Sequence, residues 1–535
     1  MPEKSESTAS SLGSTTVSRH KTKRQLNAWD SAFLYMDTPS TPMYGGFLHI
    51  YAPVAGESAA RRYQRLRWHI EHSLDASPVF RRKIVRSPLD LDHAWFVEGA
   101  DVDLDYHVRH YALPEPGNDE QLNEVYARIA VQAMDSNRPL WEIHIIDGLN
   151  AVEGVPRNGF AMFIKFHHAA VDGRSAAEIT AVLHRTNAER NRITRLKPYK
   201  AMPAPPAPTF TKALIGTAER YALLSVVVGR KLADRIPTIS NALTKRLLRD
   251  AVVSDKPIRD KLSVPQTIFN IEINADRCYT HLSLDLDEIR RIRTHVPYST
   301  VNDVYLAVIG GALRTYLREH AALPKKSLIV GVTVDVRDES DRGKGGNHVA
   351  LIRLPLGTDE ADAARRLIRI CKNTAQAKAA LKRNPEAKSK GQSVSWSRLI
   401  PAPLLWLLGG ANRLRLTARV KPLVNLGATN VPGPREVLYL DGARMVDFNG
   451  APPFFHGVAM VINTTSYDNA LRVSVTACRS VMPDPERMRE CLRESFADLR
   501  QSFAGKANKP ERTTKPKTRP KMPQKTAQVK NGTRR

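Results

Sequence analysis

An alternating hydrophobic pattern identifies one strand that is buried on both faces. From Phe160 to His168 every second side chain shares one face of the predicted strand, and the intervening side chains from Ala161 to His167 share the other. Both faces are largely apolar, which is typical of a strand in the middle of a sheet. The two adjacent histidines therefore point in opposite directions, so that only one of them can face a given cavity.

The same kinds of pattern predict strands and helices along most of the remaining chain. Short alternating segments favour strands, and apolar residues at helical spacing favour helices. The predicted strands are 46–51, 141–147, 277–284, 328–336, 349–356, 458–464 and 471–477, and the predicted helices are 59–74, 121–134, 175–183, 300–317, 361–381 and 485–503.

The length and composition of the chain allow two core domains. The chain has 535 residues, of which 42% are hydrophobic and 25% charged. Its cysteines, Cys278, Cys371, Cys478 and Cys491, are scattered without metal-ligand spacing, so we expect a reduced setting without disulfides. The first residues lack the apolar core of a signal peptide, and no apolar run approaches the roughly 18 residues of a membrane-spanning helix.

The charge of the chain favours anionic partners. It has 81 lysine and arginine residues against 54 acidic residues, a formal net charge of +27. Nucleic acid, anionic lipid and phosphorylated substrates all suit such a charge. The sequence has no zinc finger, basic zipper or aromatic-interleaved RNA motif, so we expect no nucleic acid partner.

The candidate chemistry lies at the end of the strand that is buried on both faces. A histidine there, followed four residues later by the carboxylate of Asp172, suits general-base catalysis, in which one group moves a proton and another fixes the local geometry. A single histidine at a strand end is more often structural than catalytic. The complete pattern HHxxxDG, from His167 to Gly173, is much more restrictive.

This heptapeptide, HHAAVDG, resembles the HHxxxDG signature of the coenzyme-A-dependent acyltransferase superfamily. Further motifs follow in the expected order between Leu26 and Phe503, and they narrow the resemblance to the bacterial wax ester synthase/diacylglycerol acyltransferase family. They are AWDSAFLYMD at 28–37 with TPM at 41–43, PLW at 139–141, TIFN at 267–270, TVNDVYLA at 300–307 and NVPGP at 430–434.

The resemblance implies an α/β (α+β) fold, in which two domains similar to chloramphenicol acetyltransferase have a substrate tunnel between them. Acyl-CoA and the acceptor would enter this tunnel from opposite sides. We expect a disordered N-terminal segment at 1–24, a first domain with the HHxxxDG motif at 25–195, a proline-rich linker and crossover helix at 196–262, a second domain at 263–505, and a disordered basic tail at 506–535.

The same resemblance implies an O-acyltransferase that moves a fatty acyl group from acyl-CoA to diacylglycerol, to a long-chain fatty alcohol, or to both. His168 is then the general base and His167 a supporting residue. Asp172, which precedes Gly173, orients the loop through an ion pair with Arg337. No cofactor is implied, because acyl-CoA is a substrate, and no metal site is implied.

Asn302 has two interpretations. Its amide either positions the reacting groups or stabilises the oxyanion, or it caps the following helix together with Asp303. For Asp303 we favour the structural role.

The resemblance also gives candidates for the wall of the substrate tunnel. For Trp141 we favour plain packing in the core over contact with substrate. The NVPGP motif is expected to form a rigid turn. The candidates are Trp141, Asn270, Asn430, Pro432 and Gly433.

The chain departs from the family pattern at a few positions. Tyr44 stands where many members have histidine, and Asn469 replaces a common glycine. Ile271 and Glu272 stand in place of a Gly-Pro pair. The departures at Ile271, Glu272 and Asn469 leave the acceptor preference and the catalytic efficiency open.

Two apolar segments permit contact with a membrane surface. The LLWLL run at 404–408 is either core or a docking face, and we favour core. The predicted helix at 211–249 is either packed between the domains or amphipathic on a membrane, and we favour packing. The lipid substrates implied by the resemblance predict a cytoplasmic protein, peripherally associated with the inner face of the membrane or with lipid inclusions.

Two other functions stay open. One is a related HHxxxDG acyltransferase with another hydroxyl or an amine acceptor, and the other is a lipid-surface binding protein with the same fold. A serine hydrolase is disfavoured because the sequence has no GxSxG motif. The choice between wax ester and triacylglycerol, and the oligomeric state, are also left open.

Overall fold

The computed structural model describes residues 24–98, 100–171, 179–189, 209–233, 263–335, 349–383 and 400–504. Asp172, Gly173 and Arg337 lie outside these residues, as do nearly all of the predicted N-terminal segment, most of the linker and the basic tail. The ion pair expected between Asp172 and Arg337 therefore stays a prediction.

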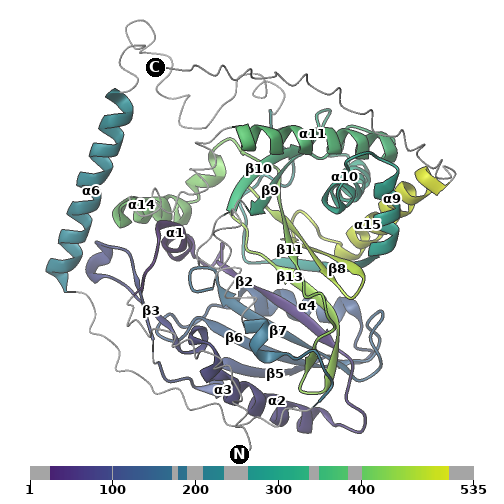
Figure 1. Cartoon of the computed structure of the whole chain (residues 1–535), viewed down its shortest axis with the longest axis horizontal. Coiled ribbons are helices and arrows are strands. Elements are labelled where there is room, and N and C mark those ends of the chain that lie inside the picture. The colour runs from purple at the N-terminus through teal and green to yellow at the C-terminus, as the bar shows by residue number, and fades with distance from the viewer. Residues whose placement is uncertain are drawn as a thin grey trace, which may run out of the picture.

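The first large sheet runs in the order β12-β13-β2-β7-β6-β5 (Figure 1). β7 lies inside it, antiparallel to β2 on one side and to β6 on the other. Phe160 and Ile164 belong to one apolar cluster, and Ala161 and Phe163 belong to another, so the predicted central strand is confirmed. The bounds are β2 Tyr44–Tyr51, β5 Val108–Ala112, β6 Trp141–Leu149, β7 Gly159–His167, β12 Tyr439–Leu440 and β13 Ala443–Ala451.

The second large sheet runs in the order β10-β9-β11-β14-β15-β8, and helices α9, α10, α11 and α15 pack against it (Figure 1). Thr300 caps α10, and the side chain of Asp303 accepts from the Thr300 N–H at 2.8 Å, which confirms the structural role favoured for Asp303. The bounds are β8 Arg277–Asp285, β9 Ile329–Asp335, β10 Val349–Pro355, β11 Leu426–Pro432, β14 Met460–Tyr467, β15 Ala470–Cys478, α9 Leu286–Thr294, α10 Val301–Glu319, α11 Ala363–Arg383 and α15 Pro485–Ala504.

Two strands from the C-terminal half, β12 and β13, belong to the sheet of the N-terminal half. β13 pairs antiparallel with β2, so that Phe448 lies opposite His49 and Ala451 opposite Gly46. The chain then passes through 452–459 into β14 of the second sheet. The two halves are thus joined by a shared strand, a pairing that hydrophobic periodicity cannot reveal because it depends on residues far apart in the sequence.

The remaining elements surround the first sheet and the junction between the halves. A small sheet runs in the order β1-β4-β3, and α1 packs on α14. The bounds are β1 Arg24–Gln25, β3 Lys83–Val85, β4 Trp95–Val97, α1 Ala28–Met36, α2 Ala59–Ser73, α3 Leu104–His107, α4 Asp119–Val131, α6 Phe210–Ala233 and α14 Ala402–Arg413, with 3₁₀ helices η1 Leu74–Ala76, η2 Pro78–Arg81, η3 Pro88–Asp90 and η6 Leu416–Arg419.

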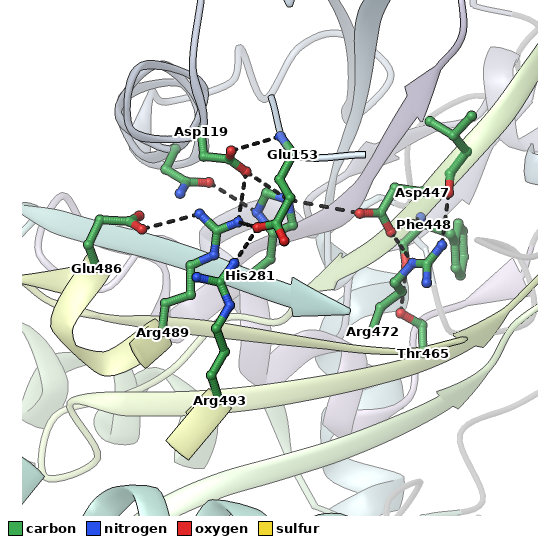
Figure 2. A network of polar contacts seen from close by, with 12 residues as sticks. Asp119, Glu153, His281, Asp447, Phe448, Thr465, Arg472, Glu486, Arg489 and Arg493 are labelled. Atoms are coloured by element: carbon green, nitrogen blue, oxygen red, sulfur yellow. Dashed lines mark hydrogen bonds and ion pairs between the residues drawn. The ribbon is translucent and has the colours of Figure 1, made fainter. Parts of the chain in front are cut away.

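A network of charged side chains also joins the two halves (Figure 2). Arg489 on α15 donates to Glu153 at 2.6 Å and to Asp119 at 3.3 Å. The Nε2 atom of His281 on β8 lies 3.9 Å from a carboxylate oxygen of Asp119 and 3.9 Å from one of Asp447. Because most of these groups are buried, they interact through a medium that screens charge less than water does.

The core position expected for the LLWLL run is wrong for most of its side chains. Leu405 is buried against α1, whereas Leu404, Trp406, Leu407 and Leu408 are exposed. The run forms part of α14, so its side chains point around the helix axis and only one in three or four can face α1.

The helix predicted at 211–249 is present as α6 in its described part, but it has little of the packing expected between the domains. Phe210, Leu214 and Ile215 are exposed. Thr217 is buried, and its hydroxyl donates to a backbone carbonyl in the loop before β4. In its first turns α6 therefore packs on one side only, at Ala213 and Thr217, and the packing expected of it is confirmed only on that side.

Candidate active site

The two histidines lie in the turn at the end of β7. The strand ends at His167, and the backbone N–H of His168 donates to the carbonyl of Met43 at 2.9 Å. The carbonyl of His167 accepts hydrogen bonds from the N–H groups of Ala170, at 2.9 Å, and Val171, at 3.2 Å. This turn fixes both histidines relative to the first sheet.

The His167 side chain is buried and held at both ring nitrogens. Its Nδ1 accepts from the backbone N–H of Ala169 at 3.0 Å, so the proton of the neutral ring is on Nε2. Nε2 lies 3.5 Å from Oδ2 of Asp37. The same oxygen accepts from the hydroxyl of Tyr44 at 3.2 Å, and the two rings meet edge to face. This environment suits the supporting role predicted for His167.

The His168 side chain lies where the two halves of the chain meet. Its imidazole stacks on Phe33 of α1, with ring centroids 4.8 Å apart, and Phe33 lies 6.5 Å from Phe455 in the segment after β13. A Cβ atom at Gly45 of β2 would lie 3.2 Å from Cδ2 of His168 and 3.2 Å from the carbonyl oxygen of Ala451. The missing side chain at Gly45 therefore leaves room for the imidazole.

Asn302 and Asn430 are brought together. Asn430 in β11 donates through Nδ2 to Oδ1 of Asn302 in the first turn of α10, at 2.7 Å. The N-cap of α10 is Thr300, so Asn302 is not the capping residue. The turn expected at NVPGP is wrong for its first three residues, because 430–432 pair with β14 as part of β11. Pro432 is tolerated there because β9 pairs only with residues 426–428, so at Pro432 β11 has a partner strand on one side only.

Asn270 is buried and bonded through both ends of its amide. Nδ2 donates to the carbonyl of Val424 at 3.0 Å and to that of Gly457 at 2.8 Å. Oδ1 accepts from Nδ2 of Asn425 at 2.8 Å. Because Gly457 belongs to the segment that carries Phe455, Asn270 supports that segment.

Trp141 is buried at the start of β6. Its Nε1 donates to the carbonyl of Phe80 at 2.9 Å, and its ring stacks on His107 with centroids 4.3 Å apart, so the core packing favoured for it is confirmed. Pro432 and Gly433 lie at the end of β11, where Gly433 packs closely on the backbone of β14. A place for these residues in a tunnel wall stays a prediction.

A cavity of about 390 Å³ lies beside His167. Its lining includes Asp37 and Tyr44, which contact His167, together with the basic residues Lys83 and Arg86. A cavity that combines an imidazole with cationic side chains suits an anionic or polar ligand.

Four residues contact the histidines without having been assigned that role from the sequence: Phe33, Asp37, Tyr44 and Gly45. For Phe33 and Asp37 the signal is the stretch AWDSAFLYMD, which contains both and which the family resemblance singles out. Their distance from the HHxxxDG segment in the chain hides the contact until α1 and β2 are placed beside β7.

A buried ion pair lies two residues before His167. The Nζ atom of Lys165 is 3.3 Å from Oε2 of Glu142 and 4.8 Å from the ring centroid of Tyr44. Burial lowers the pKa of Lys165 to about 8. Burial alone would raise the pKa of Glu142, but the hydrogen bond from His144 and the charge of Lys165 lower it to about 2. Glu142 is therefore ionised at neutral pH.

Two departures from the family pattern are accommodated locally. Glu272 forms an ion pair with Arg415 on the surface. Asn469 has a φ of 55° in the turn between β14 and β15, a conformation that asparagine adopts more readily than most residues, and its side chain donates to Asp287 at 2.8 Å.

The described ranges contain neither a candidate metal site nor a membrane-spanning helix. There, no cluster of three or more histidine, cysteine or acidic side chains could hold a metal ion. The helices of those ranges include none with the length and hydrophobicity needed to cross a membrane.

Solved structures share the fold. The wax ester synthase/diacylglycerol acyltransferase from Marinobacter aquaeolei VT8 aligns with a TM-score of 0.62 and 24% sequence identity, covering 90% of this chain and 100% of that chain. A trichothecene 15-O-acetyltransferase from Fusarium sporotrichioides aligns with a TM-score of 0.52 and 11% identity, covering 90% and 95%. The molecule is thus built from two chloramphenicol-acetyltransferase-like domains, as the sequence predicted.

The family is identified by sequence similarity. The wax ester synthase/diacylglycerol acyltransferase catalytic domain matches residues 26–305, and the C-terminal domain of the same family matches residues 345–500. Two Mycobacterium tuberculosis proteins named as diacylglycerol O-acyltransferases, Rv3480c and tgs2, are 32% and 31% identical to it, covering 90% and 88% of this chain and 97% and 98% of their own. The chain belongs to the wax ester synthase/diacylglycerol acyltransferase family of acyltransferases.

Proposed function

We propose that the protein transfers a fatty acyl group from acyl-CoA to the hydroxyl group of a diacylglycerol, of a long-chain fatty alcohol, or of both, with His168 as the general base. The observation that supports this assignment is the position of His168 at the junction of the halves. Its ring stacks on Phe33 there, in space that the missing side chain of Gly45 leaves open.

In the proposed reaction, neutral His168 takes the proton of the acceptor hydroxyl while the hydroxyl oxygen attacks the thioester carbonyl of acyl-CoA. A carbon–oxygen ester bond forms, the carbon–sulfur bond breaks, and its electron pair leaves on the thiolate of coenzyme A. The proton then passes from His168 to this thiolate, which returns the imidazole to its neutral form. An imidazole suits both transfers because its ordinary pKa lies near neutrality.

Further residues have proposed supporting roles. Asn302, held by Asn430 at 2.7 Å, is the candidate donor to the oxyanion that forms on the thioester carbonyl. Asp172 and Arg337 are expected to pair and to order the loop that follows His168 without moving protons.

We further propose that the protein works at the inner face of the cytoplasmic membrane or on lipid inclusions. Both proposed acceptors reside in lipid phases. The net charge of +27 favours contact with anionic headgroups.

The test is ester formation from palmitoyl-CoA with hexadecanol or a diacylglycerol, measured together with thiol release. The wild type should form ester with at least one acceptor, and His168→Ala should lower kcat by roughly 10²–10⁴-fold. The exposed His320 provides a matched control, and His320→Ala should keep full activity. Equal thiol release by the wild type and His168→Ala would overturn the assignment of the base. If the wild type acylates only an amine or another alcohol, the alternative acceptors are favoured.

A further inference from the structure

The outer side of α14 presents an apolar surface on a strongly charged molecule. Leu404, Trp406 and Leu407 are 51, 55 and 59% exposed, although the inner side of the same helix is buried on α1. Packing in a protein core explains only one side of such a helix. The exposed apolar residues from 404 to 423, here called the α14 surface, are Leu404, Trp406, Leu407, Leu408, Leu414, Leu416, Val420 and Leu423.

Basic side chains border the α14 surface. Residues 400–423 contain Arg413, Arg415, Arg419 and Lys421 and no aspartate or glutamate, and these four basic residues are exposed. Arg415 pairs with Glu272, so the positive charge of the border comes mainly from Arg413, Arg419 and Lys421. An apolar centre with a positive border is the composition of protein surfaces that insert shallowly into anionic membranes. The arginine and lysine side chains reach lipid phosphates, while the apolar side chains enter the boundary between headgroups and acyl chains.

The α14 surface is fixed rigidly to the helix that orients the proposed base. A Cβ atom at Gly409 would lie 2.5 Å from the carbonyl oxygen of Tyr35, so α14 and α1 are in close backbone contact. Asn412 donates to the carbonyl of Met36 at 2.9 Å. Phe33 precedes Tyr35 by two residues on α1, so it lies nearly opposite Tyr35 around the helix. The ring of Phe33 stacks on His168. The two helices lie side by side in Figure 1, so a single helix separates the α14 surface from His168.

The cavity beside His167 lies along the same helix. Leu34 of α1 lines it together with Asp37, which directly follows α1. The strand β3, which contributes Lys83 to the cavity, leads into η3, and η3 contacts α14. A surface held against α14 would therefore lie close to this cavity.

We propose that the α14 surface docks the protein on an anionic phospholipid bilayer and so brings the bilayer close to α1 and to the junction of the halves, where lipid acceptors reach His168. This inference rests on the proposed function, because it concerns the source of the acceptor. The positive border favours the bilayer over a second copy of the chain. A two-fold interface through this surface would place the basic border of one copy against the same border of the other.

Vesicle binding tests the apolar part of the surface. The wild type should float with vesicles of phosphatidylcholine and phosphatidylglycerol, and Trp406→Ser/Leu407→Ser should bind them at least about tenfold more weakly. The matched control is Leu351→Ser/Ile368→Ser, which changes two side chains that are 57 and 53% exposed on β10 and α11, and it should bind like the wild type. Equal binding by the wild type and the Trp406/Leu407 variant would overturn the proposal.

The same assay tests the basic border. Arg419→Gln/Lys421→Gln should weaken binding to the mixed vesicles about tenfold and reduce its dependence on salt. Equal binding of the wild type to mixed vesicles and to phosphatidylcholine alone would overturn the choice of an anionic surface. A wild-type dimer that Trp406→Ser/Leu407→Ser converts to a monomer would assign the surface to a second copy instead.

Turnover separates docking from chemistry. With palmitoyl-CoA and a short alcohol dissolved in buffer, Trp406→Ser/Leu407→Ser should match the wild type. With diacylglycerol in mixed vesicles, the same variant should be at least about tenfold slower. If the wild type forms ester with none of the acceptors, the proposed function is refuted, and vesicle binding still decides whether the α14 surface docks. If both proteins acylate diacylglycerol in vesicles at equal rates, the docking role is overturned.

Discussion

The imidazole of His168 stacks on the ring of Phe33, with centroids 4.8 Å apart and planes inclined by 24°. Phe33 belongs to α1, and α1 is held in turn by α14 through the close contact at Gly409 and the hydrogen bond from Asn412. The orientation of the proposed base therefore depends on a helix from each half of the chain. It is a property of the assembled fold and not of the HHxxxDG segment alone.

Replacing Phe33 by leucine should lower kcat by about five- to tenfold, because a stacking contact of this kind contributes roughly 0.5–1.5 kcal/mol and its loss lets the imidazole reorient. Leucine still fills an apolar site, so the melting temperature should change little. Steady-state kinetics with a dissolved acceptor check this, with Trp29→Leu on the 59% exposed side of α1 as the control. An unchanged kcat in Phe33→Leu would show that stacking does not position His168.

Gly45→Ala should reduce kcat by about tenfold or more. The added Cβ would lie 3.2 Å from both Cδ2 of His168 and the carbonyl oxygen of Ala451. Because this carbonyl belongs to β13, which is paired with β2, the imidazole is the neighbour that must move. Gly410→Ala is the matched control: nothing lies within 4 Å of its new Cβ, and alanine should stabilise that helix by about 0.5–1 kcal/mol with full activity. Full activity of Gly45→Ala would contradict the close approach.

Much of the fold could be predicted because hydrophobic periodicity is local. The strand predicted from Phe160 to His168 is β7 at Gly159–His167, and its two faces contact separate apolar clusters. Periodicity shows which face of an element is buried, but not which element covers it. The pairing of β13 with β2 and the exposure of Trp406 on α14 could therefore not be derived from the pattern.

The candidate site was predicted only in part, for the same reason. The sequence placed His167 and His168 at a strand end, and the family resemblance selected His168. The residues that hold these rings, Phe33 and Asp37, come from another element, and only the assembled structure brings them there. Hydrogen-bond partners depend on such long-range placement.

Removing Arg489 should destabilise the junction between the halves. Arg489→Ala leaves the buried Asp119 without its arginine partner, whereas the exposed Glu153 keeps Arg493, so we expect a loss of about 2–3 kcal/mol in the free energy of unfolding. Arg487→Ala on the same helix is the control, because Arg487 pairs with surface carboxylates such as Glu319, and such pairs contribute less. Chemical denaturation measures both, and equal losses would contradict a special role for the buried network.

The ion pair of Glu142 and Lys165 should make stability depend on pH in two windows. The pKa of Glu142 is lowered from 4.5 to about 2, so its contribution is fully present above pH 4.5 and is lost as the pH falls from 4.5 towards 2. The pKa of Lys165 is lowered from 10.5 to about 8. The unfolded chain therefore binds the extra proton between pH 8 and 10.5, and the contribution of Lys165 to stability rises with pH in that range.

Glu142→Gln tests the acidic window. The difference in melting temperature between the wild type and this variant should be largest near neutral pH and should shrink as the pH falls below 4.5, because protonation of Glu142 removes the advantage of the wild type. In the variant, Lys165 loses its carboxylate partner, so the alkaline rise in stability should begin at a lower pH than in the wild type. The exposed Glu120 provides the control, and Glu120→Gln should show neither effect. The melting-temperature difference between the wild type and Glu142→Gln could instead stay constant from neutral pH into the acidic window. That result would show that the fold does not hold the carboxylate of Glu142 in its charged form.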